Sequence, residues 1–133
     1  MARIKLEIPP YFPFTTELSV RITDINYGGH LGNDALLGLL HEARTRFLAH
    51  YGYTEKNVEG VGIIMVDAIV VYRSESFHGD RLRIHVAGDD LQTTGCDFIY
   101  RVAHAETGKE VARAKTGIAF FDYEKRKIVK LPA

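Results

Sequence analysis

The sequence predicts an α+β domain in which one long helix packs against an antiparallel sheet. Residues 33–51 have helical periodicity, and the segments after them have the composition of strands separated by turns. The chain has 133 residues, which is enough for one hydrophobic core and too few for two ordinary domains. We therefore expect residues 1–133 to form a single domain.

The composition argues against several classes of partner. Acidic and basic residues number 17 each, so no net charge attracts nucleic acid or an anionic membrane. The single cysteine, Cys96, excludes an internal disulfide framework, and prolines interrupt the N-terminal apolar residues where a signal peptide needs a continuous run. The longest apolar run, residues 61–72, is shorter than the roughly 20 residues that span a membrane. We expect a cytoplasmic protein with a small-molecule or protein partner.

The N-terminal part predicts an extended arm followed by one strand. Prolines interrupt residues 1–14 and leave room only for a short edge strand at residues 3–8. From Thr16 onward, polar and apolar residues alternate, which places Leu18, Val20 and Ile22 on the inner side of a half-buried strand. This strand leads directly to Asp24.

The helix predicted for residues 33–51 has one apolar side. At 100° per residue, four apolar side chains share a narrow arc: Leu36, Leu40, Ala43 and Phe47. Asn33 or Gly32 is expected to cap the helix. Gly38 in the interior costs about 1 kcal/mol relative to alanine, so we expect another backbone to approach there.

The second half of the chain predicts the remaining strands. Residues 61–73 are rich in isoleucine and valine without alternation, which is typical of a strand buried on both faces or of one that meets a second subunit. After a turn at residues 77–80, Leu82, Ile84 and Val86 alternate with polar residues. Turns at residues 88–90 and 106–109 then separate strands around 97–104 and 111–121.

The loop between the first strand and the helix is the best candidate for chemistry. It contains polar and glycine residues: Asp24, Asn26, Tyr27, Gly28, Gly29 and His30. A loop that enters a helix N-terminus lies beside unpaired N–H groups and the positive end of the helix dipole. Such a junction can hold an anion or a carbonyl oxygen that is becoming one.

Several motifs together resemble one family. They are the D-x-N loop, the Gly-His pair, the asparagine at the helix start, Glu-Ala-Arg in the helix, Tyr72-Arg73 and Gly79-Asp80. In this order they resemble the hotdog-fold acyl-CoA thioesterases of the 4-hydroxybenzoyl-CoA thioesterase type, over residues 17–132. The resemblance implies a five-stranded antiparallel sheet wrapped around one helix. It also implies homodimers or homotetramers with interface sites that hydrolyse acyl-CoA or acyl carrier protein thioesters.

The resemblance assigns site residues by position. Asp24, His30, Asn33 and Glu42 match family positions, but Asn26 stands where the best-known relatives have a catalytic acid. An amide cannot take a proton from water, although it can hold a water or a carbonyl by hydrogen bonds. The proton acceptor is then Glu42, Asp24 or Asp67, or it is absent.

The expected catalytic set is therefore Asp24, Asn26, His30 and Glu42. The expected substrate-binding set is Tyr27, Gly28, Gly29, Leu31, Asn33 and Asp67. Structural roles stay open for several of them: Glu42 is spaced for an ion pair with Arg46, and Asp67 is suited to a contact across an interface. The sequence shows no metal motif, and we expect no cofactor.

Two other functions remain open. Hotdog hydratases use a D-x-N-P-x-H loop, which Asp24, Asn26 and His30 resemble except that the proline is missing and the histidine lies one residue too far. Alternatively, a dimer without the family acid is suited to bind an acyl or aromatic ligand without turning it over.

Overall fold

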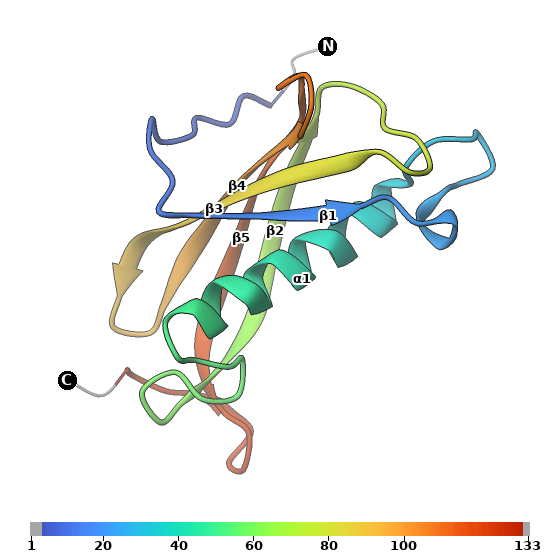
Figure 1. Cartoon of the computed structure of the whole chain (residues 1–133). Helices are drawn as coiled ribbons and strands as arrows, with labels where there is room; N and C mark the ends of the chain where they lie inside the picture. Colours follow the sequence, from blue (N-terminus) through green and yellow to red (C-terminus); the bar gives the residue numbers. More distant parts are fainter. Residues whose placement is uncertain (1–3, 132–133) are drawn as a thin grey trace.

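The computed structural model describes residues 4–131 as one helix on a curved antiparallel sheet (Figure 1). The elements are β1 (Phe14–Ser19), a 3-10 turn (Ile22–Asp24), α1 (Asn33–His50), β2 (Gly62–Tyr72), β3 (Arg81–Gln92), β4 (Gly95–His104), β5 (Glu110–Asp122) and β6 (Lys127–Ile128). The predicted α+β class is confirmed. No helix within residues 4–131 has the length and apolar character needed to cross a membrane.

The sheet order places β1 and β2 at its two edges. The strands run β1-β3-β4-β5-β2 with antiparallel neighbours, and the short β6 adds to β5. The five principal strands agree with the predicted number. At one end of α1, the hydroxyl of Tyr72 on β2 donates to the carbonyl oxygen of Asn33 at 3.0 Å. This contact fixes the end of β2 beside the start of the helix.

The helix packs its apolar side against the central strands. Leu36 and Leu40 are each 1 % exposed, and they share one core with the β3 residues Leu82, Ile84 and Val86. The predicted alternation along β3 is confirmed, because side chains of a strand point to opposite faces in turn. The loop before α1 and the β2–β3 connection meet at one end of the helix (Figure 1).

A buried cation that the sequence did not reveal links the helix to the sheet. Arg44 is 4 % exposed, and its Nη1 donates to the Tyr100 hydroxyl at 3.2 Å. That hydroxyl lies 2.7 Å from the Thr116 hydroxyl, and Arg44 Nε lies 3.7 Å from Glu55 Oε1. A buried charge needs such partners, so this network fixes the position of α1 over β4 and β5.

Three local expectations are wrong. Ile22 is 65 % exposed, not inward-facing, because the chain leaves the sheet after β1 and enters the 3-10 turn. Residues 88–90, where a turn was expected, lie inside β3. The pairing of β3 with β4 shifts register between Asp89 and Gln92, so the strand continues past the glycine and the aspartates. The expected edge strand at residues 3–8 is not a strand at residues 4–8, and Arg3 lies outside the described residues.

The apolar strand β2 is exposed along most of its length. Its sheet position leaves one edge unpaired within residues 4–131, and most of its side chains are exposed, so burial on both faces is wrong for the single subunit. Exposed apolar residues include Ile64, Met65, Val66 and Ile69. The surroundings of Gly38 are also open, with no atom within 4 Å of the place where a Cβ would lie. The alternative, contact with a second subunit, stays a prediction.

We expect Leu40→Ala to lower the free energy of unfolding by about 2–5 kcal/mol, because it opens a cavity where α1 meets the sheet. Urea denaturation monitored by circular dichroism measures this change. Leu37→Ala is the matched control, since Leu37 lies on the same helix and is 40 % exposed. It should change the stability by less than about 0.5 kcal/mol, and an equal effect of both substitutions would contradict the observed packing.

Candidate functional site

Asp24 shapes the loop that leads to the helix. Its Oδ2 accepts from the backbone N–H of Arg21 at 2.8 Å, and its Oδ1 accepts from Arg21 Nη2 at 3.1 Å. Asp24 is 5 % exposed, and the hydrogen bond from the Arg21 side chain lowers the pKa of its carboxyl group. Its carbonyl oxygen also accepts from the N–H of Gly32 at 2.9 Å. The carboxylate is therefore committed to the turn.

Asn26 and His30 face each other across Gly28. Asn26 Oδ1 accepts from the Gly28 N–H at 2.9 Å, and Gly29 adopts a φ of 82° to close the turn. A Cβ on Gly28 would lie 3.3 Å from Asn26 Oδ1 and 3.4 Å from His30 Nε2. The glycines thus let the two polar side chains approach one another, and the NH₂ group of Asn26 is not used by this turn.

The ring of His30 is held by the main chain. Its Nδ1 lies 3.1 Å from the carbonyl oxygen of Leu31. A carbonyl oxygen only accepts, so Nδ1 carries the hydrogen and Nε2 is left to face outward. Nε2 lies 3.9 Å from Glu75 Oε1. Leu31 itself is buried and donates its N–H to the carbonyl of Ser76, so it anchors this end of the loop.

The first turn of α1 has no side-chain cap. Gly32 is the N-cap residue. The first intrahelical hydrogen bond runs from the N–H of Leu36 to the carbonyl oxygen of Gly32 at 3.1 Å. The N–H groups of Asn33, Asp34 and Ala35 precede that bond and point out of the helix end. They lie at the positive end of the helix dipole, where an oxyanion is stabilised.

Two hollows flank this helix end. One, of about 620 Å³, is lined by Asn26, Asn33, Asp34 and Ala35 together with Thr23, Asp24, Ile25 and Tyr27. The other, of about 240 Å³, is lined by residues of the loop, the helix and the end of β2, among them His30, Asn33, Tyr72 and Arg73. Asn33 borders both. The structure therefore brings Asn26, His30 and Asn33 to the same end of the helix.

Asp34 is a site residue that sequence reasoning missed. It is not among the site residues expected from the sequence, yet it lines the same hollow as Asn26. A Cβ on Gly32 would lie 2.8 Å from Asp34 Oδ1, so the carboxylate folds back over the helix start. Burial, followed by the charge of Asp34, raises the pKa of Tyr72. The signal available in the sequence was an aspartate in the first helical turn, directly after the loop.

The structure places Glu42 away from Asn26, His30 and Asn33. Its Oε2 accepts from Arg46 Nε at 2.8 Å, and Arg46 in turn contacts Thr16 and the carbonyl of Glu17 on β1. Glu42 lies nine residues after Asn33 in the helix, which corresponds to about 13.5 Å along the axis. In the single subunit it therefore does not line a hollow with Asn26.

Asp67 lies apart from the loop's polar groups, whereas Tyr27 borders the same hollow as Asn26. Asp67 Oδ1 accepts from the Gly117 N–H at 3.0 Å, and a Cβ on Gly117 would lie 2.3 Å from that oxygen. Because Thr116 and Ile118 face the helix core, Gly117 and Asp67 belong to the opposite face of the sheet. The side chain of Tyr27 is fully exposed in the single subunit.

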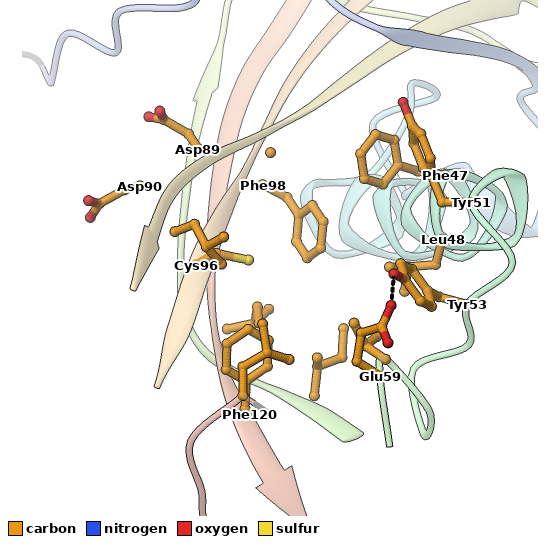
Figure 2. Close-up of a pocket in the computed structure, with 16 residues that line it drawn as sticks. Phe47, Leu48, Tyr51, Tyr53, Glu59, Asp89, Asp90, Cys96, Phe98 and Phe120 are labelled. Carbon is orange, nitrogen blue, oxygen red and sulfur yellow. Dashed lines mark hydrogen bonds between the residues drawn. The ribbon is translucent and has the colours of Figure 1, made fainter. Parts of the chain in front are cut away.

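A cavity with mainly apolar walls lies at the other end of α1 (Figure 2). Its volume is about 580 Å³, and its walls include Phe47, Tyr51, Phe98 and Phe120. The helix has 18 residues, so about 27 Å separates this end from the loop. Burial raises the pKa of the Cys96 thiol in the cavity wall to about 11, which keeps it protonated. Three acids also border this cavity: Glu59, Asp89 and Asp90. Glu59 accepts a hydrogen bond from the Tyr53 hydroxyl, and Figure 2 shows Asp89 and Asp90 directed away from the cavity.

Comparisons with known proteins agree with this arrangement of elements. Three solved structures share the fold, each with a TM-score of 0.80. A 1,4-dihydroxy-2-naphthoyl-CoA thioesterase from Synechocystis is 24 % identical, with 90 % of this chain and 89 % of that chain covered. A DHNA-CoA thioesterase from Staphylococcus aureus is 16 % identical, with 88 % and 79 % covered. The gentisyl-coenzyme A thioesterase BH1999 is 16 % identical, with 90 % and 97 % covered.

At these identities the likeness concerns the hotdog arrangement of the sheet and helix alone. No curated protein matches the sequence. A family model does match it: residues 20–133 fit the thioesterase-like superfamily. This range includes the loop, α1 and all strands after it. The chain therefore belongs to the thioesterase-like superfamily, and its enzymatic class is thioester hydrolase.

Proposed function

We propose that this enzyme hydrolyses acyl-CoA thioesters, as do enzymes of the 4-hydroxybenzoyl-CoA thioesterase type, at the junction of the loop and α1. One observation carries the proposal: the uncapped first turn of α1, the Asn26 amide and the Asp34 carboxylate line one hollow. Three structures of similar fold are named for aromatic acyl-CoA substrates. Aromatic acyl groups are therefore the first substrates to assay.

The arrangement suits attack by water on a thioester carbonyl. The carbonyl oxygen accepts hydrogen bonds from the N–H groups at the helix start and from the NH₂ group of Asn26, which stabilise its developing negative charge. The carboxylate of Asp34 takes a proton from the attacking water. A C–O bond forms, the C–S bond breaks, and the thiolate leaves. The Nε2 side of His30 faces the neighbouring hollow, where it orients the substrate.

The hydratase alternative is less well supported by the loop. It requires Asp24 and His30 as an acid–base pair at one substrate atom. The Asp24 carboxylate instead binds the backbone and side chain of Arg21 and is 5 % exposed.

Binding of an apolar ligand is a second candidate function. The cavity of about 580 Å³ with aromatic walls supports it, because such volumes accommodate small ligands. Release of free thiol from an acyl-CoA panel distinguishes hydrolysis from binding alone.

We also propose that two copies pair along β2. A long apolar edge strand with unpaired backbone groups tends to pair with another strand. Pairing would cover Met65 and Ile69, which are 44 % and 38 % exposed. Because Tyr72 lies beside the helix start, antiparallel pairing would bring the partner's strand end close to the site.

For the dimer, light scattering should show twice the mass of the chain at micromolar concentration. We expect Met65→Lys to shift the mass toward the monomer, because a charge would be buried in the paired edge. Leu91→Lys is the control, since Leu91 is a single apolar side chain, 71 % exposed, on β3. A monomeric wild-type protein would contradict the pairing.

Asn26→Ala should lower kcat/KM by about 10²-fold or more, since it removes a hydrogen-bond donor that acts on the developing oxyanion. Thermal unfolding tests whether the loop still folds. Asn26→Asp reports the role of the amide: a negative charge opposes the oxyanion and lowers the rate, whereas a rise in rate would show that an acid is preferred here. Wild-type kcat/KM in both variants would exclude Asn26 from the reaction.

Asp34→Asn and Glu42→Gln compare the two carboxylates directly. Asp34→Asn should lower kcat by about 10²-fold or more, with little change in KM for the acyl-CoA. Glu42→Gln removes only an exposed ion pair with Arg46, so it should keep most of the activity. The reverse ranking would assign the proton transfer to Glu42, as the family resemblance suggested, and would exclude Asp34.

A further inference from the structure

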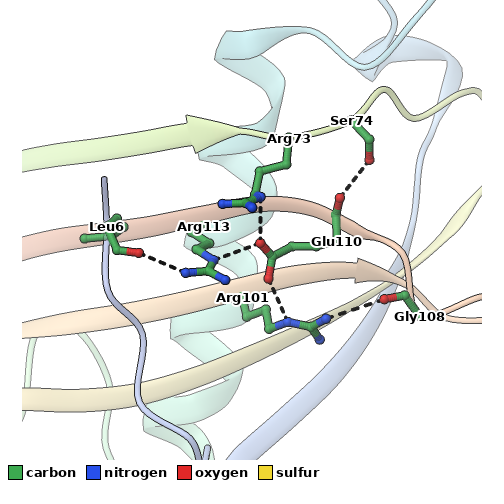
Figure 3. Close-up of polar contacts among 7 residues, drawn as sticks. All are labelled: Leu6, Arg73, Ser74, Arg101, Gly108, Glu110 and Arg113. Atoms are coloured by element: carbon green, nitrogen blue, oxygen red, sulfur yellow. Dashed lines mark hydrogen bonds and ion pairs between the residues drawn. The ribbon is translucent and has the colours of Figure 1, made fainter. Parts of the chain in front are cut away.

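Three arginines on the sheet face opposite α1 share one carboxylate (Figure 3). Arg113 Nε lies 2.8 Å and Arg73 Nε 3.0 Å from Glu110 Oε1, and Arg101 Nε lies 2.9 Å from Oε2. Burial disfavours the charged form of Glu110, but hydrogen bonds from Arg113 and Arg101 outweigh this effect and lower its pKa. We call these three arginines with Glu110 the arginine cluster.

The cluster has more positive charge than its own contacts balance. Within residues 4–131, Glu110 is the carboxylate that forms ion pairs with all three arginines, and no second acid pairs with any of them. In addition, Arg101 lies directly opposite Arg113 across β4 and β5. Like charges in direct register destabilise a sheet. A bound anion would relieve this repulsion.

The cluster is accessible and polar enough to bind a ligand. The side chains of Arg73, Arg101 and Arg113 are 49 %, 30 % and 27 % exposed, whereas Glu110 is 15 % exposed. Guanidinium groups therefore form part of the surface beside the carboxylate, although Arg113 Nη1 also donates to the Leu6 carbonyl and Arg101 Nη2 to the Gly108 carbonyl. Their N–H groups have the planar geometry that binds phosphate oxygens in pairs.

The cluster is also continuous with the proposed site. Arg73 and Ser74 line the hollow that contains His30, Asn33 and Tyr72. The same two residues contact Glu110, through Arg73 Nε and through the Ser74 hydroxyl, which donates to the Glu110 carbonyl at 2.8 Å. A substrate that leaves the helix start through this hollow passes Arg73 and reaches the cluster.

We propose that the arginine cluster binds the phosphate groups of the coenzyme A nucleotide, and so selects CoA thioesters over acyl carrier protein thioesters. This inference rests on the proposed site at the start of α1. Coenzyme A carries a 3′-phosphate and a diphosphate beyond its pantetheine arm, which match several guanidinium groups on one face. The pantetheine of an acyl carrier protein lacks the 3′-phosphoadenosine.

Direct binding tests the proposal without requiring turnover. Titration calorimetry with coenzyme A, pantetheine and adenosine 3′,5′-bisphosphate should show that coenzyme A binds at least about tenfold more tightly than pantetheine. Arg101→Gln and Arg113→Gln should each weaken binding of coenzyme A by roughly tenfold, the lower end of the range for a charge-assisted hydrogen bond. Neither should affect pantetheine. Equal affinities of the wild type for coenzyme A and pantetheine would overturn the proposal.

Arg83→Gln is the matched control. Arg83 is an arginine on the neighbouring strand β3, is 42 % exposed, and pairs with Glu17 at 3.0 Å. It should leave the affinity for coenzyme A unchanged. If Arg83→Gln weakens binding as much as Arg101→Gln does, the effect is general surface charge, and the assignment to the cluster is wrong.

Glu110→Gln separates phosphate binding from a structural role. Removing the competing carboxylate leaves three arginines without a counter-charge, so affinity for coenzyme A should rise by about fivefold even if the variant is less stable in thermal unfolding. A purely structural cluster predicts weaker or unchanged binding instead. An anion site therefore predicts tighter binding of coenzyme A by Glu110→Gln and weaker binding by Arg101→Gln.

Hydrolysis assays separate this inference from the proposed function. If acyl-CoA and acyl-pantetheine are cleaved with equal kcat/KM, the thioesterase proposal stands and the phosphate site is excluded. If coenzyme A binds through the arginines but no thioester is cleaved, the phosphate site stands and the proposed function falls. Preference for an acyl carrier protein thioester, lost in Arg101→Gln, would assign the cluster to an acidic protein partner and overturn the proposal.

Discussion

The packing of α1 against β3, β4 and β5 determines where its first turn lies, and the proposed chemistry depends on that position. Leu36 and Leu40 are buried in the shared core, and Arg44 binds Tyr100 from within it. These contacts fix the helix along its length. Short-range bonds, from Arg21 to Asp24 and from Gly28 to Asn26, and the bond from the Leu31 N–H to the Ser76 carbonyl hold the loop over the helix start. A rigid helix end preorganises its N–H groups before a substrate arrives.

Periodicity predicted the elements whose environment is set by their own sequence. The helix and the alternation of Leu82, Ile84 and Val86 follow from spacing alone, because one face of each element is buried. The position of β2 at the sheet edge does not follow, since strand order is a property of the whole topology. Ile22 was misplaced for a related reason: alternation continues in the sequence after the chain has left the sheet.

The candidate site was predicted in part. The grouping of Asn26, His30 and Asn33 followed from their closeness in the chain to one helix end. The identity of the nearby acid did not, because the sequence offered Glu42, Asp24 or Asp67 as the proton acceptor, whereas the structure places Asp34 beside Asn26. The arginine cluster was also hidden, since Arg101 and Arg113 lie on β4 and β5 and Arg73 directly follows β2, so that they meet only through the register of the sheet.

The central claim is that the acyl transfer chemistry occurs at the start of α1 and not in the aromatic cavity at its other end. A crystal structure with a coenzyme A thioether, in which a methylene separates the sulfur from a carbonyl group, tests this most directly. Our account predicts the carbonyl oxygen within hydrogen-bond distance of the N–H groups of residues 33–35 and of Asn26. A ligand whose carbonyl lies between Phe98 and Phe120, with the helix start unoccupied, would contradict it.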